Sequence, residues 1–139
     1  MLNQQIVLAS RPTADATLDN FRLEQKQLAP LTDGQVLVRN QYLSLDPYMR
    51  GRMNDAKSYA EPQPLDQVMI GGTAGEVLES RNDAFKPGDK VVGMGGWQEY
   101  FVVDAKQRGV LQKVDATHVP LSVYLGAMGM PGVTAWYGL

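Results

Sequence analysis

Short runs of apolar, strand-forming or alternating residues, separated by turn residues, dominate the first 115 residues, and such runs are typical of β-strands. In Phe21–Gln25 the period is two residues, as expected for a strand with one exposed face. Turn sequences such as Asp33-Gly34 separate these runs. The pattern predicts strands at Gln4–Ala9, Phe21–Gln25, Val36–Leu43, Val68–Glu79, Lys90–Met94, Glu99–Val103 and Val110–Val114. Many short strands at this spacing predict a mainly β fold, either an antiparallel barrel or a sandwich.

Two of the connections between these strands carry further signals. Lys86-Pro87-Gly88-Asp89 is a tight-turn sequence, because proline presets one backbone angle and glycine tolerates the next. The segment Leu45–Gln67 is polar, irregular and punctuated by prolines. Such a long non-repetitive stretch in a compact domain is typical of a binding loop.

The last 20 residues differ in kind from the rest of the chain. Leu121–Met128 predicts a short helix with an apolar face, Met130-Pro131-Gly132 interrupts it, and Val133–Leu139 begins a second helix. This tail is apolar all round and ends without a polar cap, which favours a segment that continues into another domain. The alternative is a terminal helix docked on the barrel. We expect a domain over residues 1–120 and a helical connector over residues 121–139.

Composition restricts the class of protein. The apolar share is 44%, the charged share is 20% and the net charge is −2, which fits one soluble globular domain and gives no basic surface for nucleic acid or anionic membrane. There is no cysteine. The chain has no basic N-terminal region followed by an apolar run, and no stretch reaches the roughly 18 apolar residues of a membrane span. We therefore expect a cytoplasmic protein.

Few side chains offer catalysis on their own. His118 is the only histidine, and its place in a turn favours a surface role over a triad or a zinc ligand. The carboxylates of the predicted loop are scattered and are interpreted as solvated. The glycine run Gly71–Gly75 is followed by a strand pattern rather than a helix, so it does not fit a dinucleotide fingerprint. Glycines there are expected to allow close backbone packing or a bulge.

The segment Leu43–Met53 is the strongest candidate for a functional site. Asp46 is expected to cap a helical turn whose first residue is Pro47. Tyr48 would then project from a rigid turn and offer a flat apolar face together with a hydroxyl group. On composition alone, a turn that packs Tyr48 into the core is an equally good interpretation.

This segment carries a resemblance to a known family. Leu43-Ser44-Leu45-Asp46-Pro47-Tyr48-Met49-Arg50, followed by Gly51-Arg52-Met53, resembles a signature of the leukotriene B4 dehydrogenase/prostaglandin reductase branch of the medium-chain dehydrogenase/reductases. Gly126–Leu139 is similar to the same branch, especially to its bacterial curcumin reductases and plant alkenal reductases. The resemblance covers nearly the whole chain. It implies a GroES-like, partly open barrel with short helices, and a C-terminal helical segment that leads toward a Rossmann domain absent from this sequence.

The resemblance also implies a chemistry. Members of this branch reduce the carbon–carbon double bond of α,β-unsaturated ketones and aldehydes with NADP(H). Zinc-containing relatives carry a cysteine near Asp46 and a histidine where this chain has Gly72, so no metal is expected. The resemblance places Tyr48, Met49, Tyr59 and Trp97 on the substrate wall, and Tyr48, Met130 and Thr134 near the nicotinamide. The tyrosine that would donate a proton lies outside this chain, and Arg50 and Arg52 are interpreted as structural or surface residues.

Two other functions stay open. One is a quinone oxidoreductase of the same superfamily, and the other is a non-enzymatic GroES-like binding module.

We expect a homodimer for the parent protein. For the 139-residue chain alone we expect an independent fold, no bound NADP(H), no catalysis, and self-association through residues 123–139.

Overall fold

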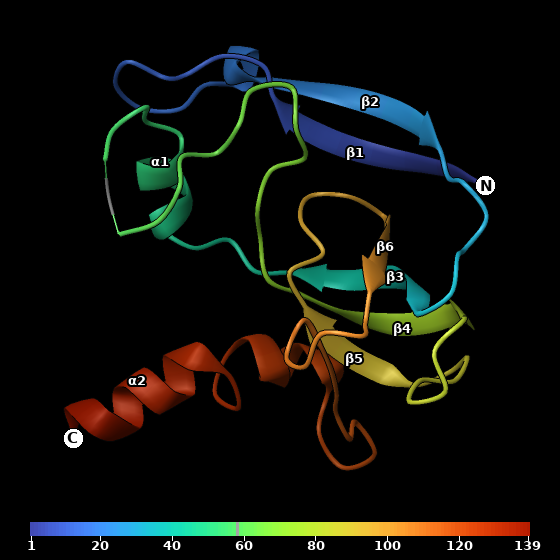
Figure 1. Cartoon of the computed structure of the whole chain (residues 1–139). Coiled ribbons are helices and arrows are strands. Elements are labelled where there is room, and N and C mark those ends of the chain that lie inside the picture. The colour runs from blue at the N-terminus through green and yellow to red at the C-terminus, as the bar shows by residue number, and fades with distance from the viewer. Residues whose placement is uncertain (58) are drawn as a thin grey trace.

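The computed structural model describes residues 1–57 and 59–139, and it is built mainly of short strands (Figure 1). Two 3-10 helices and two α-helices complete it. The elements are β1 (Leu2–Leu8), η1 (Leu18–Asn20), β2 (Phe21–Gln27), β3 (Gln35–Leu43), α1 (Tyr48–Arg52), β4 (Thr73–Ser80), β5 (Lys90–Gly93), β6 (Tyr100–Asp104), β7 (Leu111–Lys113), η2 (Leu121–Leu125) and α2 (Met130–Gly138). Every predicted strand is present, with its ends shifted by a few residues.

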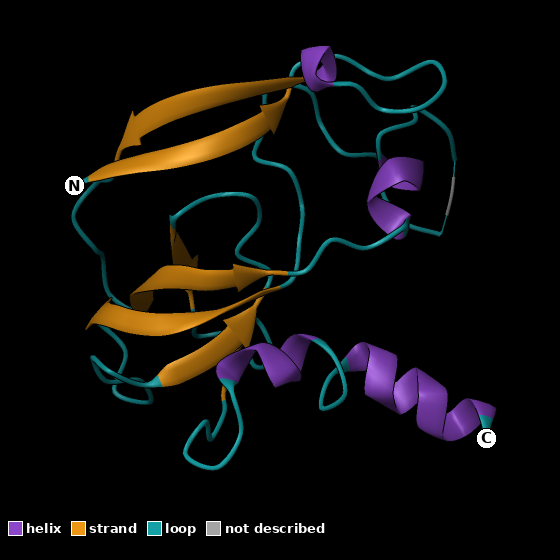
Figure 2. Cartoon of the chain, turned by 180° about the vertical axis from the view of Figure 1, so that it is seen from behind, coloured by secondary structure: helices purple, strands orange, loops and turns teal. Residues whose placement is uncertain are grey.

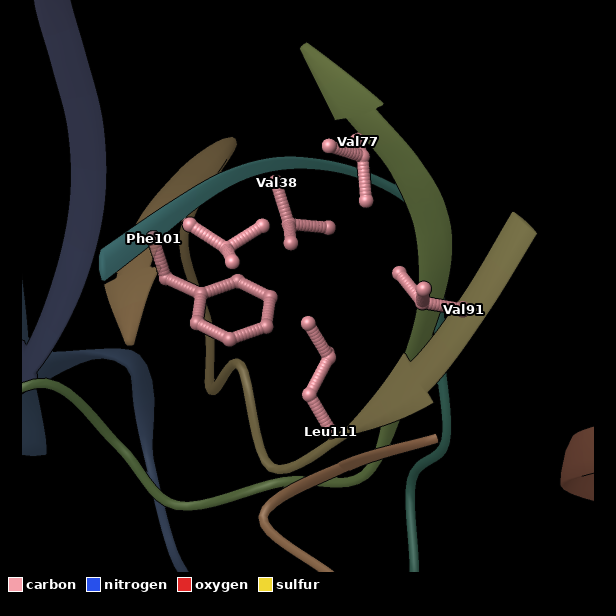
Figure 3. Packing of buried hydrophobic residues seen from close by; sticks show 6 residues of the cluster. Val38, Val77, Val91, Phe101 and Leu111 are labelled. Atoms are coloured by element: carbon pink, nitrogen blue, oxygen red, sulfur yellow. The ribbon is translucent and has the colours of Figure 1, made fainter. Parts of the chain in front are cut away.

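The larger sheet has five antiparallel strands in the order β6-β3-β4-β5-β7. It curls around a hydrophobic core, and Figure 3 shows side chains from its strands pointing toward one another inside the curve. The buried members of this core are Val36, Val38, Val77, Val91, Phe101 and Leu111. The strands β6 and β7 form the two ends of the sheet and are not paired with each other. The prediction of a mainly β, partly open barrel is confirmed.

The strands β1 and β2 form a separate antiparallel hairpin, which lies over one side of the curled sheet (Figures 1 and 2). Three backbone hydrogen bonds connect this hairpin to two loops, and together they form a closed ring among Ile6, Met69 and Trp97. The Ile6 amide donates to the Trp97 carbonyl at 2.8 Å, the Trp97 amide donates to the Met69 carbonyl at 2.9 Å, and the Met69 amide donates to the Ile6 carbonyl at 2.9 Å. Since each segment both donates and accepts, the hairpin is fixed to the loops before β4 and β6 without belonging to the larger sheet.

The glycine run Gly71–Gly75 leads into β4, as predicted from the sequence. Gly75 lies where the backbones of β4 and β3 approach each other closely. The pairing register between the two strands shifts between Asn40 and Tyr42, opposite Gly75. A Cβ atom on Gly75 would lie 2.2 Å from the carbonyl oxygen of Arg39. Because this neighbour is backbone, it cannot rotate away. The close approach of the two strands therefore requires glycine at this position.

Replacing Gly75 by alanine is expected to lower the free energy of unfolding by about 1–3 kcal/mol, because β3 and β4 must separate to admit the methyl group. Gly51 is a matched control, since it lies in α1 and a Cβ atom there would meet nothing within 4 Å. Gly51→Ala should be neutral or stabilising by up to about 1 kcal/mol. Urea denaturation of both variants measures the difference, and equal midpoints would contradict this account of Gly75.

The structure corrects three details of the predicted elements. The strand expected from Val68 begins only at Thr73, because Val68 instead forms a bridge with Val7 of β1. The expected helix over 121–128 is a 3-10 helix that ends at Leu125. Pro131 does not interrupt a helix but occupies the first turn of α2. Amides in the first turn have no acceptor within the helix, so proline costs no hydrogen bond there.

The two C-terminal helices differ in their packing. η2 packs against β4 and β5 through the buried Leu121. No residue of α2 is buried, and the helix extends away from the barrel (Figures 1 and 2). Its side chains include the exposed Val133, Trp136 and Tyr137. Within the described part of the chain, no helix is long and apolar enough to cross a bilayer.

Candidate functional site

A cavity of about 350 Å³ lies between the loop that carries α1, the start of β4 and the segment from η2 to α2. α1 and α2 are on the same side of the larger sheet in both views (Figures 1 and 2). The lining is mostly apolar and includes three tyrosines and two charged side chains. The lining residues are Ser44, Asp46, Tyr48, Arg52, Tyr59, Ile70, Gly72, Met94, Tyr124, Leu125, Met130 and Pro131.

The short helix α1 determines which side chains reach this cavity. Tyr48 and Arg52 are four residues apart, so they share one face of the helix, and both line the cavity. Met49 lies on another face and is only 4% exposed, packed with Leu8, Met53 and Met69. The two apolar residues of the Tyr48-Met49 pair are thereby separated. One forms the cavity wall and the other forms the core beneath it.

The start of α1 differs from the expected cap. The Asp46 side chain makes no capping hydrogen bond; the Asp46 carbonyl instead accepts the Met49 amide at 3.1 Å. The helix begins at Tyr48, one residue after Pro47. The Asp46 carboxylate is free to line the cavity because it has no role in the helix end.

Arg50 holds α1 against the loop after β1. Its Nε donates to the Ala14 carbonyl at 3.0 Å, and its Nη1 donates to the Asn54 side chain at 2.8 Å. Nη2 also donates to the Pro12 carbonyl at 3.4 Å. Arg11 adds a bond from the same loop to the Met53 carbonyl at 2.8 Å. The interpretation of Arg50 as a structural residue is confirmed, and its hydrogen bonds fix the helix that presents Tyr48.

Burial raises the pKa of the Tyr48 hydroxyl, and the nearby negative charge of Asp46 raises this pKa further. The positive charge of Arg52 acts in the opposite direction on the same group. Because the pKa lies above the ordinary tyrosine value of about 10, Tyr48 keeps its proton throughout the physiological range. Its hydroxyl therefore remains a hydrogen-bond donor facing the cavity.

The structure brings together three of the residues predicted for the site. Tyr48, Tyr59 and Met130 all line the cavity, with Tyr59 on its open side at 88% exposure. Thr134 does not line it and lies exposed on α2, one turn beyond Met130.

Two residues predicted for the substrate wall, Met49 and Trp97, do not line this cavity. Met49 is in the core, as described. The Trp97 ring stacks on Phe21, with ring centroids 5.4 Å apart and an angle of 19° between the planes. Both Trp97 backbone groups are held in the hydrogen-bonded ring, and its side chain packs against the core cluster that contains Leu8 and Met49. Met94, three residues earlier, lines the cavity instead.

Sequence reasoning missed most of the apolar wall. Ile70, Met94, Leu125 and Tyr124 come from three separate segments and carry no local signal that distinguishes them from core residues. Tyr124 has one structural mark, since its hydroxyl donates to the Asp115 carbonyl at 2.6 Å and so fixes η2. The C-terminal family resemblance covers Gly126–Leu139 and not η2, so the part of the cavity wall that η2 forms was not predicted.

Over residues 1–57 and 59–139, no group of three or more histidine, aspartate or glutamate side chains is placed to hold a metal ion. The expected exposed position of His118 is confirmed. That the protein contains no zinc stays a prediction.

A curled antiparallel sheet, a capping hairpin and a cavity between α1 and the start of α2 match the GroES-like N-terminal domain of the medium-chain dehydrogenase/reductases. The comparison with protein families agrees. The profile described as the N-terminal domain of oxidoreductase matches residues 4–114. The chain belongs to this family, and its resemblance to the branch of curcumin, alkenal and prostaglandin reductases is confirmed.

Individual relatives support the assignment. The chain is 47% identical to the NADPH-dependent curcumin reductase of Escherichia coli over 137 residues, covering 99% of this chain and 39% of that protein. It is 39% identical to the NADP(+)-dependent 2-alkenal reductase of Nicotiana tabacum, covering 98% of this chain and 40% of that protein. The crystal structure of CurA from Vibrio vulnificus in complex with NADPH superposes with a TM-score of 0.87 at 48% identity, over 98% of this chain and 40% of CurA. The chain thus spans about 40% of these relatives' length.

Proposed function

We propose that this chain forms the substrate-side wall of an NADP(H)-dependent reductase that acts on the carbon–carbon double bond of α,β-unsaturated ketones and aldehydes. One observation carries the proposal: Tyr48 on α1 and Met130 at the start of α2 line the same apolar cavity. The similarity to curcumin and alkenal reductases supports the same reaction class. We further propose that residues 121–139 connect this domain to a cofactor-binding domain.

The cavity suits the nicotinamide end of the cofactor. Tyr48, Met130 and Pro131 offer flat or flexible apolar surfaces to an aromatic ring. When bound, NADPH supplies the hydride for the reduction. The diphosphate finds no equivalent cradle in the described residues, because Gly71–Gly75 lead into β4 rather than into a helix. We therefore assign to this chain only the nicotinamide end of the cofactor site.

The residues of the chain contribute positioning and electrostatics. The apolar wall excludes water from the bound substrate, which strengthens any hydrogen bond made inside the cavity. The protonated Tyr48 hydroxyl can donate to the substrate carbonyl oxygen, where negative charge develops as the double bond is reduced. Met94, Leu125 and Ile70 hold the hydrocarbon part of the substrate. The protein thereby aligns the double bond and stabilises the developing charge.

In the full-length protein, Tyr48→Phe is expected to lower kcat/KM for an enone by about 10- to 100-fold, since one donor to the developing negative charge is lost. Steady-state kinetics with 4-phenyl-3-buten-2-one measures the effect. The KM for NADPH and the thermal unfolding midpoint serve as controls, because the phenyl ring preserves the packing. Wild-type kinetics for the variant, or a higher kcat/KM of the wild type with a quinone, would contradict the proposal.

A further inference from the structure

Gln63 is a buried polar residue of the loop between α1 and β4, and it does not line the cavity. It is only 3% exposed. Its Nε2 donates to the Val68 carbonyl at 3.1 Å and to the Pro64 carbonyl at 3.2 Å, and its Oε1 accepts the Ile70 amide at 2.9 Å. A glutamine amide has two N–H donors and one acceptor oxygen, so these bonds use both kinds of group. The backbone from Pro64 to Ile70 is therefore held by a single side chain.

The hydrogen bonds of Gln63 reach two residues that do line the cavity. Its backbone amide donates to the carbonyl of Arg52, the last residue of α1, at 2.6 Å. Its side chain holds the Ile70 amide in the segment before β4, as described. Arg52 and Ile70 come from different segments of the cavity wall. Gln63 thus connects the helix that presents Tyr48 to the segment that presents Ile70, without lining the cavity itself.

The other contacts near Ile70 do not fix its distance from α1 in the same way. The Met69 amide donates to the Ile6 carbonyl at 2.9 Å, which fixes this segment to the hairpin and not to α1. Met49 of α1 belongs to the same core cluster as Met69. Methionine side chains adapt to small shifts, whereas a hydrogen bond holds its two atoms within a narrow range of distances. The bonds of Gln63 therefore determine the spacing between α1 and Ile70.

We propose that Gln63 is a positioning residue that sets the spacing between Tyr48 and Ile70, and that it thereby determines how well substrates with a large hydrocarbon part fit. This inference rests on the proposed function and adds to it a specificity-determining residue outside the cavity. Tyr48 is the proposed donor to the carbonyl oxygen, and Ile70 belongs to the wall that holds the hydrocarbon part. A misplacement of about 1 Å can lower a rate by about 100-fold. A small enone that reaches Tyr48 but not Ile70 should be insensitive to it.

Four variants of the full-length protein separate positioning from stability. Gln63→Met keeps an unbranched side chain of similar length and removes the amide. Gln63→Glu keeps the shape, but its ionised carboxylate can donate to neither carbonyl, and only the protonated form regains one donor. Gln25→Met is the matched control, because Gln25 is exposed on β2 and does not line the cavity. Gly75→Ala is expected to lower stability, as described, and Gly75 is not part of the cavity wall.

The experiment compares 4-phenyl-3-buten-2-one with 3-buten-2-one, which has the same reacting group without the phenyl ring. For Gln63→Met, the loss of kcat/KM should be about 10- to 100-fold larger for the phenyl ketone, mainly through its KM, with an unchanged KM for NADPH. Gln63→Glu should show the same loss at about pH 8. It should recover part of the wild-type ratio at about pH 6, because burial favours the protonated carboxyl. Gln25→Met and Gly75→Ala should leave the ratio between the two ketones unchanged.

Two outcomes would refute the inference while leaving the proposed function intact. One is an equal loss on both ketones for Gln63→Met, with a thermal unfolding midpoint lowered as in Gly75→Ala, because Gln63 would then be merely structural. The other is a ratio in Gln63→Glu that stays at the wild-type value at about pH 8, and this arm decides the matter if Gln63→Met does not fold. If the wild type reduces neither ketone, the proposed function fails and the inference fails with it.

Discussion

Replacement of Phe101 by alanine is expected to lower the free energy of unfolding by about 3–5 kcal/mol, the largest effect on stability that we expect from any single substitution considered for this chain. Phe101 is 7% exposed and lies inside the curled sheet, where Figure 3 shows its ring facing side chains from the other strands. Truncation removes most of an aromatic side chain and leaves a cavity that β3 and β5 cannot close without disturbing their pairing with β4. Because small domains are stable by about 5–15 kcal/mol, such a loss is a large share of the total.

Trp136 provides a matched aromatic control. It lies on α2 at 77% exposure, so Trp136→Ala should change the free energy of unfolding by no more than about 0.5 kcal/mol. Urea denaturation of the 139-residue chain, followed by far-UV circular dichroism, gives the free energy of unfolding of both variants under the same conditions. Comparable losses at the two positions would mean that α2 packs on the barrel in solution, contrary to the structure.

The 139-residue chain alone is expected to bind NADPH with a Kd weaker than about 1 mM and to reduce no enone. α2 does not supply a diphosphate site, because its first turn has few free amides. Pro131 has no amide hydrogen, and the Gly132 amide already donates to the Gly126 carbonyl at 3.1 Å. The nicotinamide ring alone would retain only a fraction of the binding free energy of the whole cofactor.

Calorimetric titration of the chain with NADPH measures this directly, with the full-length protein as the positive control. A micromolar Kd for the chain would show that the cofactor site lies within these residues.

The exposed apolar side chains of α2 also favour self-association of the 139-residue chain. Sedimentation velocity at several concentrations tests this, and Trp136→Ala should weaken any dimer that forms. A homodimer of the full-length protein stays a prediction.

The strands could be predicted from sequence because each is a short run of strand-forming residues that is set off by turn sequences such as Asp33-Gly34. The boundary of β4 could not, since Val68 has the composition of a strand but pairs with Val7, more than sixty positions earlier. Local composition gives no information on such a partner. The first turn of α2 was misread for a different reason, because proline is compatible with both the end and the start of a helix.

For the candidate site, one segment could be predicted from the sequence, but most of the cavity wall could not. The motif around Asp46 and Pro47 located α1, and Tyr48 does line the cavity. Nothing in the motif distinguished Tyr48 from Met49, because both are apolar and the helix is too short to show a periodic face. Which face of a one-turn helix is buried depends on residues distant in sequence, here Leu8 and Met69.

The hydrogen-bonded ring of Ile6, Met69 and Trp97 has a consequence for the order in which the chain folds. Its three members are separated by long stretches of sequence, so their meeting carries a large loop-closure entropy. The ring becomes favourable only after formation of the β1–β2 hairpin and of the larger sheet has lowered the conformational entropy of the intervening segments. The three amides should therefore gain protection from hydrogen exchange late in refolding and together. In the native state they should open as one unit, which would release the hairpin while the curled sheet persists.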